Sequence, residues 1–244
     1  MGFHDLLYCN LALTLCIILN YCIQGVVRVE TNDLNPQHRL FVVLLDGRLL
    51  FFRRQKYLNP VLVIPTATMR VVLPEEDPIK SVSAETNKID VLINNAAIKI
   101  DDKELQDVSA EIVQNTMNVN LTGPLLMAKH FVEFLKKSDH ARLVNISGRL
   151  ASLLLLEDQK WGSYSYNGSK AAMNIATRMM AHELKPDGIC VVAVHPGWMQ
   201  TDMGGVSADL EPSVSAERVL GLIANLTLAD TNKFLVYNGE DHPW

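Results

Sequence analysis

The sequence predicts an α/β fold, a doubly wound parallel sheet whose first βαβ unit is atypical or incomplete. Short apolar runs rich in β-branched residues alternate with longer helical patterns, as expected for parallel strands joined by helical crossovers. The 244 residues, 48% of them hydrophobic and 20% charged, can form one large domain with a well-buried core. In such a fold, a ligand is expected beyond the carboxyl ends of the strands.

The elements are predicted in chain order from these two patterns. Strands are expected where a short apolar run is rich in β-branched residues, at Phe41–Leu45, Val61–Ile64, Arg70–Leu73, Val91–Asn94, Leu143–Ile146, Ile189–His195 and Phe234–Tyr237. Helices are expected where apolar residues recur at helical spacing, at Pro78–Lys88, Ser109–Lys137, Tyr164–Leu184 and Ser215–Leu228. The alternation implies right-handed crossovers between the strands.

The beginning of the chain does not follow this pattern. The 22 residues Leu6–Val27 carry no charge, which is about the length of a membrane-spanning helix. No basic segment precedes them and no convincing cleavage site follows, so they make a poor secretory signal. Three interpretations remain: a membrane anchor, a buried core helix, or sequence that does not belong to the functional protein.

Charge and cysteine content exclude several classes of function. The net charge of −5, without a basic stripe, gives no general attraction to nucleic acid. Cys9, Cys16, Cys22 and Cys190 form no C-x-x-C pair and have no histidines at ligand spacing, so neither a metal site nor a disulfide framework is expected. A reducing compartment, the cytoplasm, fits best, with association to a membrane through Leu6–Val27 as the alternative.

The most informative motif is Tyr166-Asn167-Gly168-Ser169-Lys170, at the start of a predicted helix. Residues i and i+4 share a helix face, so the phenol of Tyr166 and the ammonium of Lys170 can point into one pocket. A nearby cation favours the phenolate and should lower the tyrosine pKa, which suits proton transfer to or from a carbonyl or alcohol oxygen.

Polar and turn residues gather at the ends of three predicted strands. Asn94-Asn95-Ala96-Ala97 follows the first, Ser147-Gly148 follows the second, and His195-Pro196-Gly197 with Thr201 follows the third. Asn120 lies in the helix between the first two. With Tyr166 and Lys170, these motifs stand in the order and spacing of the short-chain dehydrogenase/reductase family. The chain resembles the carbonyl-reductase branch of that family that includes the C-factor and sniffer proteins.

The resemblance covers residues 69–244, and residues 1–68 form an atypical N-terminal region without it. It implies a Rossmann-like fold and an enzyme that acts on CH-OH or C=O groups with NADP or NAD, NADP being favoured by the resemblance alone. It also implies a small carbonyl substrate, and a homo-oligomer formed through the helices Ser109–Lys137 and Tyr164–Leu184.

The family's roles transfer residue by residue. Tyr166 would donate a proton to the carbonyl oxygen, Lys170 would lower its pKa and bond the nicotinamide ribose, and Asn120 would hold a water that relays protons to Lys170. The cofactor would contact a further set of positions: Asn95, Ala96, Pro196, Gly197 and Thr201. Asn94, grouped with them, more simply braces neighbouring strands. His195 is expected to be structural.

The chain departs from the family at the active-site serine, where it has Gly148. Ser147 is one residue away and would face the other side of the strand, while Ser152 lies further along the loop. Ser147 is kept as the catalytic candidate, although neither serine is an assured substitute. A second departure is Ala97, where the family usually has glycine.

The third departure concerns the cofactor. The family holds its dinucleotide with a glycine-rich turn after the first strand, but the only glycines before residue 94 are Gly2, Gly25 and Gly47. Two hypotheses follow. The chain is an NAD(P)-dependent oxidoreductase with a divergent or misassigned N-terminal region, or it is a catalytically inactive relative that keeps the fold for a binding or scaffolding role.

Overall fold

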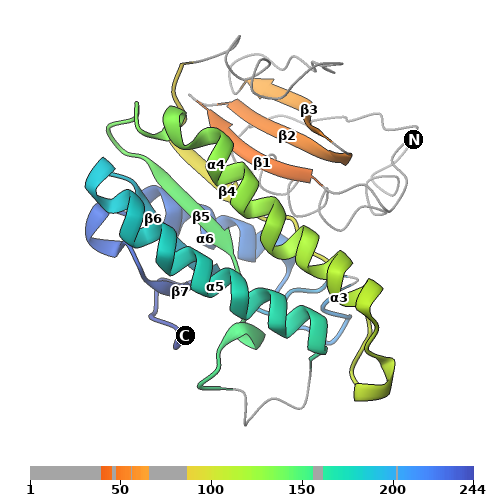
Figure 1. The fold of residues 1–244 in the computed structure, drawn as a ribbon. Coiled ribbons are helices and arrows are strands. Elements are labelled where there is room, and N and C mark those ends of the chain that lie inside the picture. Colours follow the sequence, from red (N-terminus) through yellow and green to blue (C-terminus); the bar gives the residue numbers. More distant parts are fainter. Residues whose placement is uncertain (1–39, 46–47, 56, 66–86, 156–161, 202) are drawn as a thin grey trace, which may run out of the picture.

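In the computed structural model, the described residues are 40–45, 48–55, 57–65, 87–155, 162–201 and 203–244. They form a sheet of seven strands in the order β3-β2-β1-β4-β5-β6-β7 (Figure 1). The apolar stretch Leu6–Val27, the predicted strand Arg70–Leu73 and all but the end of the predicted helix Pro78–Lys88 lie outside these residues. No helix among the described residues is long and apolar enough to span a membrane.

Four strands form the parallel part of the sheet. They are β4 (Val91–Asn94), β5 (Arg142–Ile146), β6 (Cys190–His195) and β7 (Phe234–Val236), each parallel to its neighbour. All four were predicted from the sequence, with boundaries within one residue of those observed. Their carboxyl ends meet at one edge of the sheet, where the prediction placed the ligand.

Helices cover both faces of this parallel part. On one face lie α4 (Gly123–Leu135) and α5 (Tyr164–Leu184), and α6 (Pro212–Asn225) lies on the other (Figure 1). The doubly wound arrangement is therefore confirmed. The predicted bounds of α5 match those of the structure, whereas α6 begins and ends three residues earlier than predicted.

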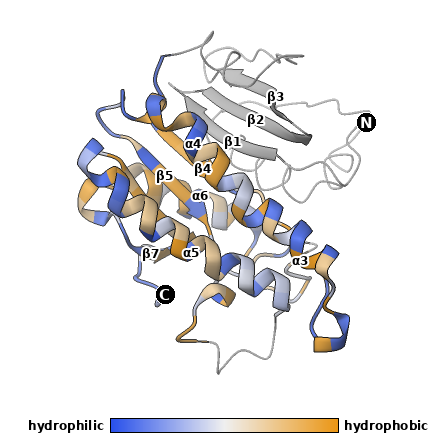
Figure 2. Ribbon diagram, viewed as in Figure 1, coloured by the Kyte–Doolittle hydropathy of each residue, from blue (hydrophilic) through white to orange (hydrophobic). Residues whose placement is uncertain are grey.

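Each face has its own apolar core. Leu143 and Val191 pack with α4 and α5, while their neighbours Val144 and Val192 pack with α6. Successive residues of a strand point to opposite faces, so a strand covered on both sides must be apolar throughout. Figure 2 accordingly shows hydrophobic residues along much of β4 and β5 and of the helices beside them.

The other three strands are antiparallel, in the part of the chain where an atypical first unit was predicted. They are β1 (Leu40–Leu45), β2 (Arg48–Gln55) and β3 (Tyr57–Pro65), and the sequence did not predict β2. Only two residues separate β1 from β2, and one separates β2 from β3. A parallel crossover needs a dozen or more residues, so these connections permit only an antiparallel arrangement.

The direction of β1 decides which edge its connection reaches. Val42 pairs with Ile93 and Leu44 with Val91, so β1 runs antiparallel to β4. The carboxyl end of β1, followed by Gly47, therefore lies at the edge opposite to the carboxyl end of β4. The carboxyl end of β1 is therefore not beside the carboxyl ends of β4, β5 and β6.

The predicted helix Ser109–Lys137 is interrupted. It comprises α3 (Ala110–Met117), a π-helical turn at Asn118–Thr122, and then α4. Ser109 caps its start, with its Oγ accepting from the N–H of Ile112 at 3.2 Å. The π turn widens the backbone around Asn120, which is buried within it.

Candidate active site

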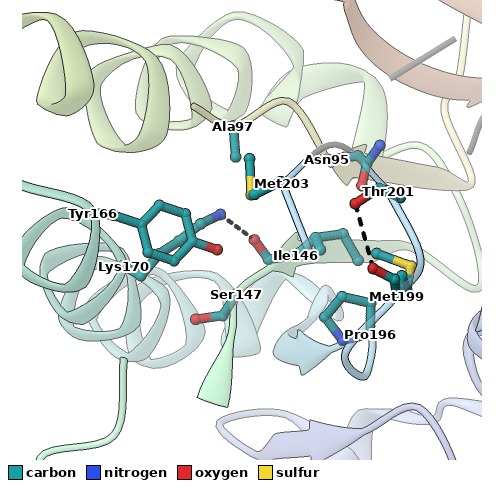
Figure 3. A pocket seen from close by; sticks show the side chains of 10 residues that line it. All are labelled: Asn95, Ala97, Ile146, Ser147, Tyr166, Lys170, Pro196, Met199, Thr201 and Met203. Atoms are coloured by element: carbon teal, nitrogen blue, oxygen red, sulfur yellow. Dashed lines mark hydrogen bonds between the residues drawn. The ribbon is translucent and has the colours of Figure 1, made fainter. Parts of the chain in front are cut away.

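A pocket opens at the carboxyl ends of β4, β5 and β6 (Figure 3). Its lining residues are Asn95, Ala97, Ile146, Ser147, Tyr166, Lys170, Pro196, Met199, Thr201 and Met203. Six of these were predicted as site residues, and they come from the segments that follow three strands and from the first turns of α5. The structure thus brings together residues that lie more than 100 positions apart in the sequence.

Tyr166 is positioned by the capped start of α5. Ser163 is the N-cap residue, and its Oγ accepts from the N–H of Tyr166 at 3.3 Å. Asp102 adds a second cap, because its main-chain oxygen and its carboxylate accept from the N–H groups of Tyr164 and Ser165, at 3.2 and 2.9 Å. These bonds satisfy donors that a helix start leaves unpaired, and so fix the turn that carries Tyr166.

Lys170 shares the helix face of Tyr166, as the spacing predicted. Its side chain is buried, and its Nζ donates to the main-chain oxygen of Ile146 at 2.7 Å. Nζ also lies 6.0 Å from the centroid of the tyrosine ring. Figure 3 shows the hydroxyl and the amine on the same side of the pocket.

The pKa of Tyr166 differs from the sequence expectation. Burial raises the pKa of its phenol to about 12, and burial lowers the pKa of Lys170 to about 8. Desolvation disfavours the charged form of each group, and here it outweighs the attraction of the lysine for a phenolate. The expectation of a lowered tyrosine pKa is therefore wrong for the protein alone. The phenol is protonated at neutral pH and available as a proton donor.

Asn120 lies beside the pocket rather than in its lining. Its Oδ1 accepts from the N–H of Ile98 at 2.7 Å, and its Nδ2 donates to the oxygen of Ile98 at 2.8 Å. Nδ2 also donates to Ser169 Oγ at 2.9 Å. The side chain thus ties the segment after β4 to α5, on the turn between Tyr166 and Lys170.

Asn94, Asn95 and Ala96 occupy three different environments at the end of β4. Asn94 is buried and donates from Nδ2 to Oδ1 of Asn145 on β5 at 2.8 Å, which confirms that it braces neighbouring strands. Ala96 belongs to the apolar core. Only Asn95 lines the pocket.

The segment after β6 forms another wall. Pro196 and Thr201 line the pocket, and the oxygen of Pro196 accepts from Ser215 Oγ at 2.5 Å. Gly197 is outside the lining but has a φ of 87°, and a Cβ there would lie 2.4 Å from a side-chain carbon of Leu210. Only glycine fits this turn, which sets the course of the wall.

Ser147 and Gly148 point in different directions. Ser147 is buried and donates from Oγ to Oδ1 of Asn174 at 2.6 Å. At Gly148 the backbone is extended, with φ −164°, and a Cβ would lie 3.4 Å from the hydroxyl oxygen of Tyr166. A side chain at position 148 would therefore face the tyrosine. Ser152 is engaged elsewhere, because its Oγ donates to the main-chain oxygen of Trp244.

His195 packs among aromatic rings at the end of β6. Its ring makes an edge contact with His242, with centroids 5.5 Å apart. Burial, followed by the charges of His242 and Arg149, lowers the pKa of His195 to about 4. It is neutral at physiological pH and lies outside the pocket lining, consistent with the structural role expected for it.

Three lining residues were not singled out in the sequence: Ile146, Met199 and Met203. Ile146 ends an apolar strand, so nothing distinguishes it from a core residue. The methionines lie in the segment after β6, and no spacing within that segment indicates which side chains face inward. Among the described residues, no cluster of metal-ligating side chains was found.

The described residues fit one half of a nicotinamide dinucleotide. Tyr166 and Lys170 can bond a ribose, and Thr201 with the backbone after Pro196 can bond a carboxamide. For the pyrophosphate, the sequence has no glycine-rich turn, and the connection after β1 begins at the opposite edge of the sheet. The fit is therefore to the nicotinamide and its ribose.

Comparisons with known proteins agree with this geometry. A family model described as short chain dehydrogenase matches residues 75–211. The C-signal protein of Myxococcus xanthus is 36% identical over 159 residues, which cover 65% of this chain and 95% of the relative.

Two solved structures are similar to the chain. They are the carbonyl reductase Sniffer of D. melanogaster and an NADPH-bound carbonyl reductase from chicken fatty liver. Each matches with a TM-score of 0.65 and 30% identity, over 68% of this chain and 71% of the other. The resemblance inferred from the strand-end motifs, including the C-factor and sniffer branch, is confirmed.

Proposed function

The chain belongs to the short-chain dehydrogenase/reductase family, and from this premise we propose that it is an NAD(P)-dependent oxidoreductase that reduces a small carbonyl compound to the alcohol, or catalyses the reverse. The observation that carries the proposal is the pairing of Tyr166 with Lys170 in a pocket at the carboxyl ends of three parallel strands. NADP is preferred over NAD only because NADPH is bound by one of the similar structures.

In the proposed reaction, Tyr166 is the general acid. NADPH or NADH, when bound, supplies the hydride that the carbonyl carbon accepts. Tyr166 gives its hydroxyl proton to the carbonyl oxygen, so that the C=O bond becomes H–C–O–H. Its raised pKa keeps that proton in place at neutral pH until the oxygen gains negative charge. Return of a proton from solvent to the phenolate completes the cycle.

Lys170 has two roles in the proposal. Its ammonium stabilises the phenolate that forms as the proton leaves, and its N–H groups hold the nicotinamide ribose. The hydrogen bond to the oxygen of Ile146 sets the direction of the side chain for both. Asn120 supports this arrangement by fixing Ser169, its neighbour on α5.

Stabilisation of the carbonyl oxygen is the weak part of the site. Gly148 offers no hydroxyl toward Tyr166, and the hydroxyl of Ser147 is committed to Asn174. Ser147 stays the candidate for polarising the carbonyl, provided that its bond to Asn174 is exchanged for one to substrate. We expect the chemical step to be slower than in relatives that have a serine facing the tyrosine.

Consumption of NADPH tests the proposal. The purified protein is mixed with NADPH and with a panel of aldehydes, ketones and quinones, and the loss of reduced-nicotinamide fluorescence is followed. Turnover of at least one carbonyl compound is expected. Saturable binding of NADPH without consumption by any class would refute the enzymatic proposal.

That outcome would favour the second candidate, an inactive relative with a binding or scaffolding role. Two observations support this alternative. Position 148 is a glycine, and the carboxyl end of β1 lies at the edge of the sheet opposite to the pocket. The retention of Tyr166, Lys170 and Asn120 supports the enzyme.

A homo-oligomer through α4 and α5 is part of the proposal. Ile175 and Met179, one turn apart on α5, are 61% and 67% exposed, and Leu125 and Leu126 of α4 are partly exposed. A second copy packed on this face would cover them. Light scattering of Met179→Glu against the wild-type protein tests this, since a charge at the interface should reduce the mass of the oligomer. Equal masses would contradict it.

A further inference from the structure

We propose that Lys99 makes this site selective for carbonyl substrates that also carry a carboxylate, that is, for oxo acids. The inference rests on the proposed reduction at Tyr166 and names the substrate class for it. The observation is a second lysine at the tyrosine: Lys99 Nζ lies 6.0 Å from the centroid of the Tyr166 ring, as far as Lys170 Nζ does.

The backbone that carries Lys99 is held at both ends. On one side, Ile98 forms two hydrogen bonds with the side chain of Asn120. On the other side, Asp102 accepts hydrogen bonds from two N–H groups in the first turn of α5, the helix that carries Tyr166. Only three residues lie between these anchors. Lys99 is therefore presented to the tyrosine by a fixed segment rather than by a free surface loop.

Lys99 has no counter-ion among the described residues. It is half-buried, and neither of the two acidic groups nearest to it in sequence forms an ion pair with it. Asp101 pairs with Lys103 at 3.1 Å, and the buried carboxylate of Asp102 accepts from the N–H of Ser165 through Oδ2, while its Oδ1 has no hydrogen-bond partner among the described residues. A partly desolvated ammonium without an anion attracts one.

The pocket offers no anion of its own. None of its lining residues is acidic, and Ile146, Met199 and Met203 are among its apolar ones. Lys99 is not itself a lining residue, so a substrate that places its carbonyl oxygen at the hydroxyl of Tyr166 would reach it by extending its carboxylate along the tyrosine ring toward Lys99 Nζ. The ion pair would then orient the carbonyl for proton transfer, in a site that excludes part of the solvent.

A matched pair of aldehydes tests the inference. Both 4-carboxybenzaldehyde and methyl 4-formylbenzoate present the same aldehyde on the same ring, but only the first carries a charge. We expect kcat/KM to favour the acid by about 10-fold, the size of a hydrogen bond to a charged group. The preference should shrink as ionic strength rises from about 0.05 M to about 0.5 M.

Variants identify the residue responsible. Lys99→Gln should remove most of the preference while leaving the ester's kcat/KM and the affinity for NADPH unchanged, and Lys99→Glu should make the ester the better substrate. The matched control is Lys103→Glu, the same charge change on the same segment at an exposed lysine paired with Asp101. It should leave the preference within about 2-fold of the wild-type value, as expected for an exposed pair.

The outcomes separate this inference from the proposed function. Reduction of both aldehydes with equal efficiency, or a preference that survives Lys99→Gln, overturns the selectivity and leaves the reductase intact. A fall in NADPH affinity in Lys99→Gln would assign the lysine to the cofactor and also overturns it.

If neither aldehyde is reduced, calorimetric binding of 4-(hydroxymethyl)benzoate and its methyl ester decides the matter without turnover. Tighter binding of the acid that depends on Lys99 supports the anion site although the reaction fails. Equal binding, or none, overturns the site as well.

Discussion

The two parts of the sheet differ in strand direction. The parallel part carries the pocket residues, and the described residues of the antiparallel part form no turn beside them that would hold a pyrophosphate. In the part β4–β7, parallel strands send three consecutive connections to one edge, and these connections carry the pocket residues. In the part β1–β3, the strands alternate in direction, so the connection after β1 leaves from the opposite edge. The first part fits a nicotinamide ring and its ribose. Among the described residues of the second part, none forms a turn for the pyrophosphate at that edge.

Strand order alone does not make a dinucleotide site. The order β3-β2-β1-β4-β5-β6 is that of a dinucleotide-binding sheet, yet only the parallel strands bring their loops together. Substitutions in each part test this difference between the parallel and the antiparallel strands.

The largest effect is expected in the parallel part, at Tyr166. Tyr166→Phe removes the proton donor and should lower kcat by about 1000-fold, while the affinity for NADPH changes little. The control is Tyr164→Phe, which alters a half-exposed tyrosine one residue beyond the N-cap of α5. Steady-state kinetics and fluorescence titration of both variants give the comparison. Wild-type turnover in Tyr166→Phe would show that another group donates the proton.

The next effect tests the antiparallel part. β1 lies between β2 and β4, so Val43→Pro removes a main-chain donor from an inner strand. We expect it to lower the free energy of unfolding by about 3 kcal/mol, as a proline does inside a regular element. Urea denaturation measures this against Val43→Thr, which keeps the N–H. Equal stability of the two variants would mean that β1 is not an inner strand.

A smaller effect, and a gain, is expected at Gly148. Its extended backbone accepts any residue, and a side chain there faces the hydroxyl of Tyr166. Gly148→Ser should raise kcat for carbonyl reduction by about 10-fold, because the new hydroxyl can stabilise the carbonyl oxygen. The control is Gly221→Ser on α6, where a side chain meets open space instead of the tyrosine. Unchanged or lower kcat in Gly148→Ser would contradict the assigned geometry.

The smallest effect is on the pH dependence of carbonyl reduction. Tyr166 keeps its proton to about pH 12, so its titration does not limit the reaction near neutrality. Lys170 is charged below its pKa of about 8 and neutral above it, so the stabilising cation is lost as pH rises. We expect the rate to be level below about pH 7 and to fall several-fold by about pH 10. A rate that stays level over this range would argue against a role for the lysine charge.

The sequence predicted the parallel part well because its signals are local. Asn95, Ser147 and Pro196 each follow an apolar run, and parallel strands bring such positions to one edge. For Tyr166 and Lys170, the spacing of four residues on a helix was enough to predict that both side chains point into one pocket. All five line the pocket in the structure.

What the sequence could not predict depends on packing and direction. Nothing in Phe41–Leu45 indicates which way the strand runs, and the antiparallel pairing follows from connections that are recognised only once β2 is known. The raised pKa of Tyr166 is caused by burial, and the spacing of Tyr166 and Lys170 in the sequence does not indicate how deeply the phenol is buried. The position of Lys99 at the tyrosine depends on contacts of Ile98 and Asp102 with distant helices.

Titration with whole and truncated cofactor tests the central claim, that the parallel part holds the nicotinamide half of NADPH. Binding of NADPH and of the reduced nicotinamide mononucleotide is followed by fluorescence and by the shift in Tm, with Lys170→Met as the control for the ribose contact. We expect both to bind, with dissociation constants within about 10-fold of each other, and Lys170→Met to weaken the binding of both alike. No binding of NADPH at millimolar concentration, or binding about 1000-fold tighter than that of the mononucleotide, would contradict it.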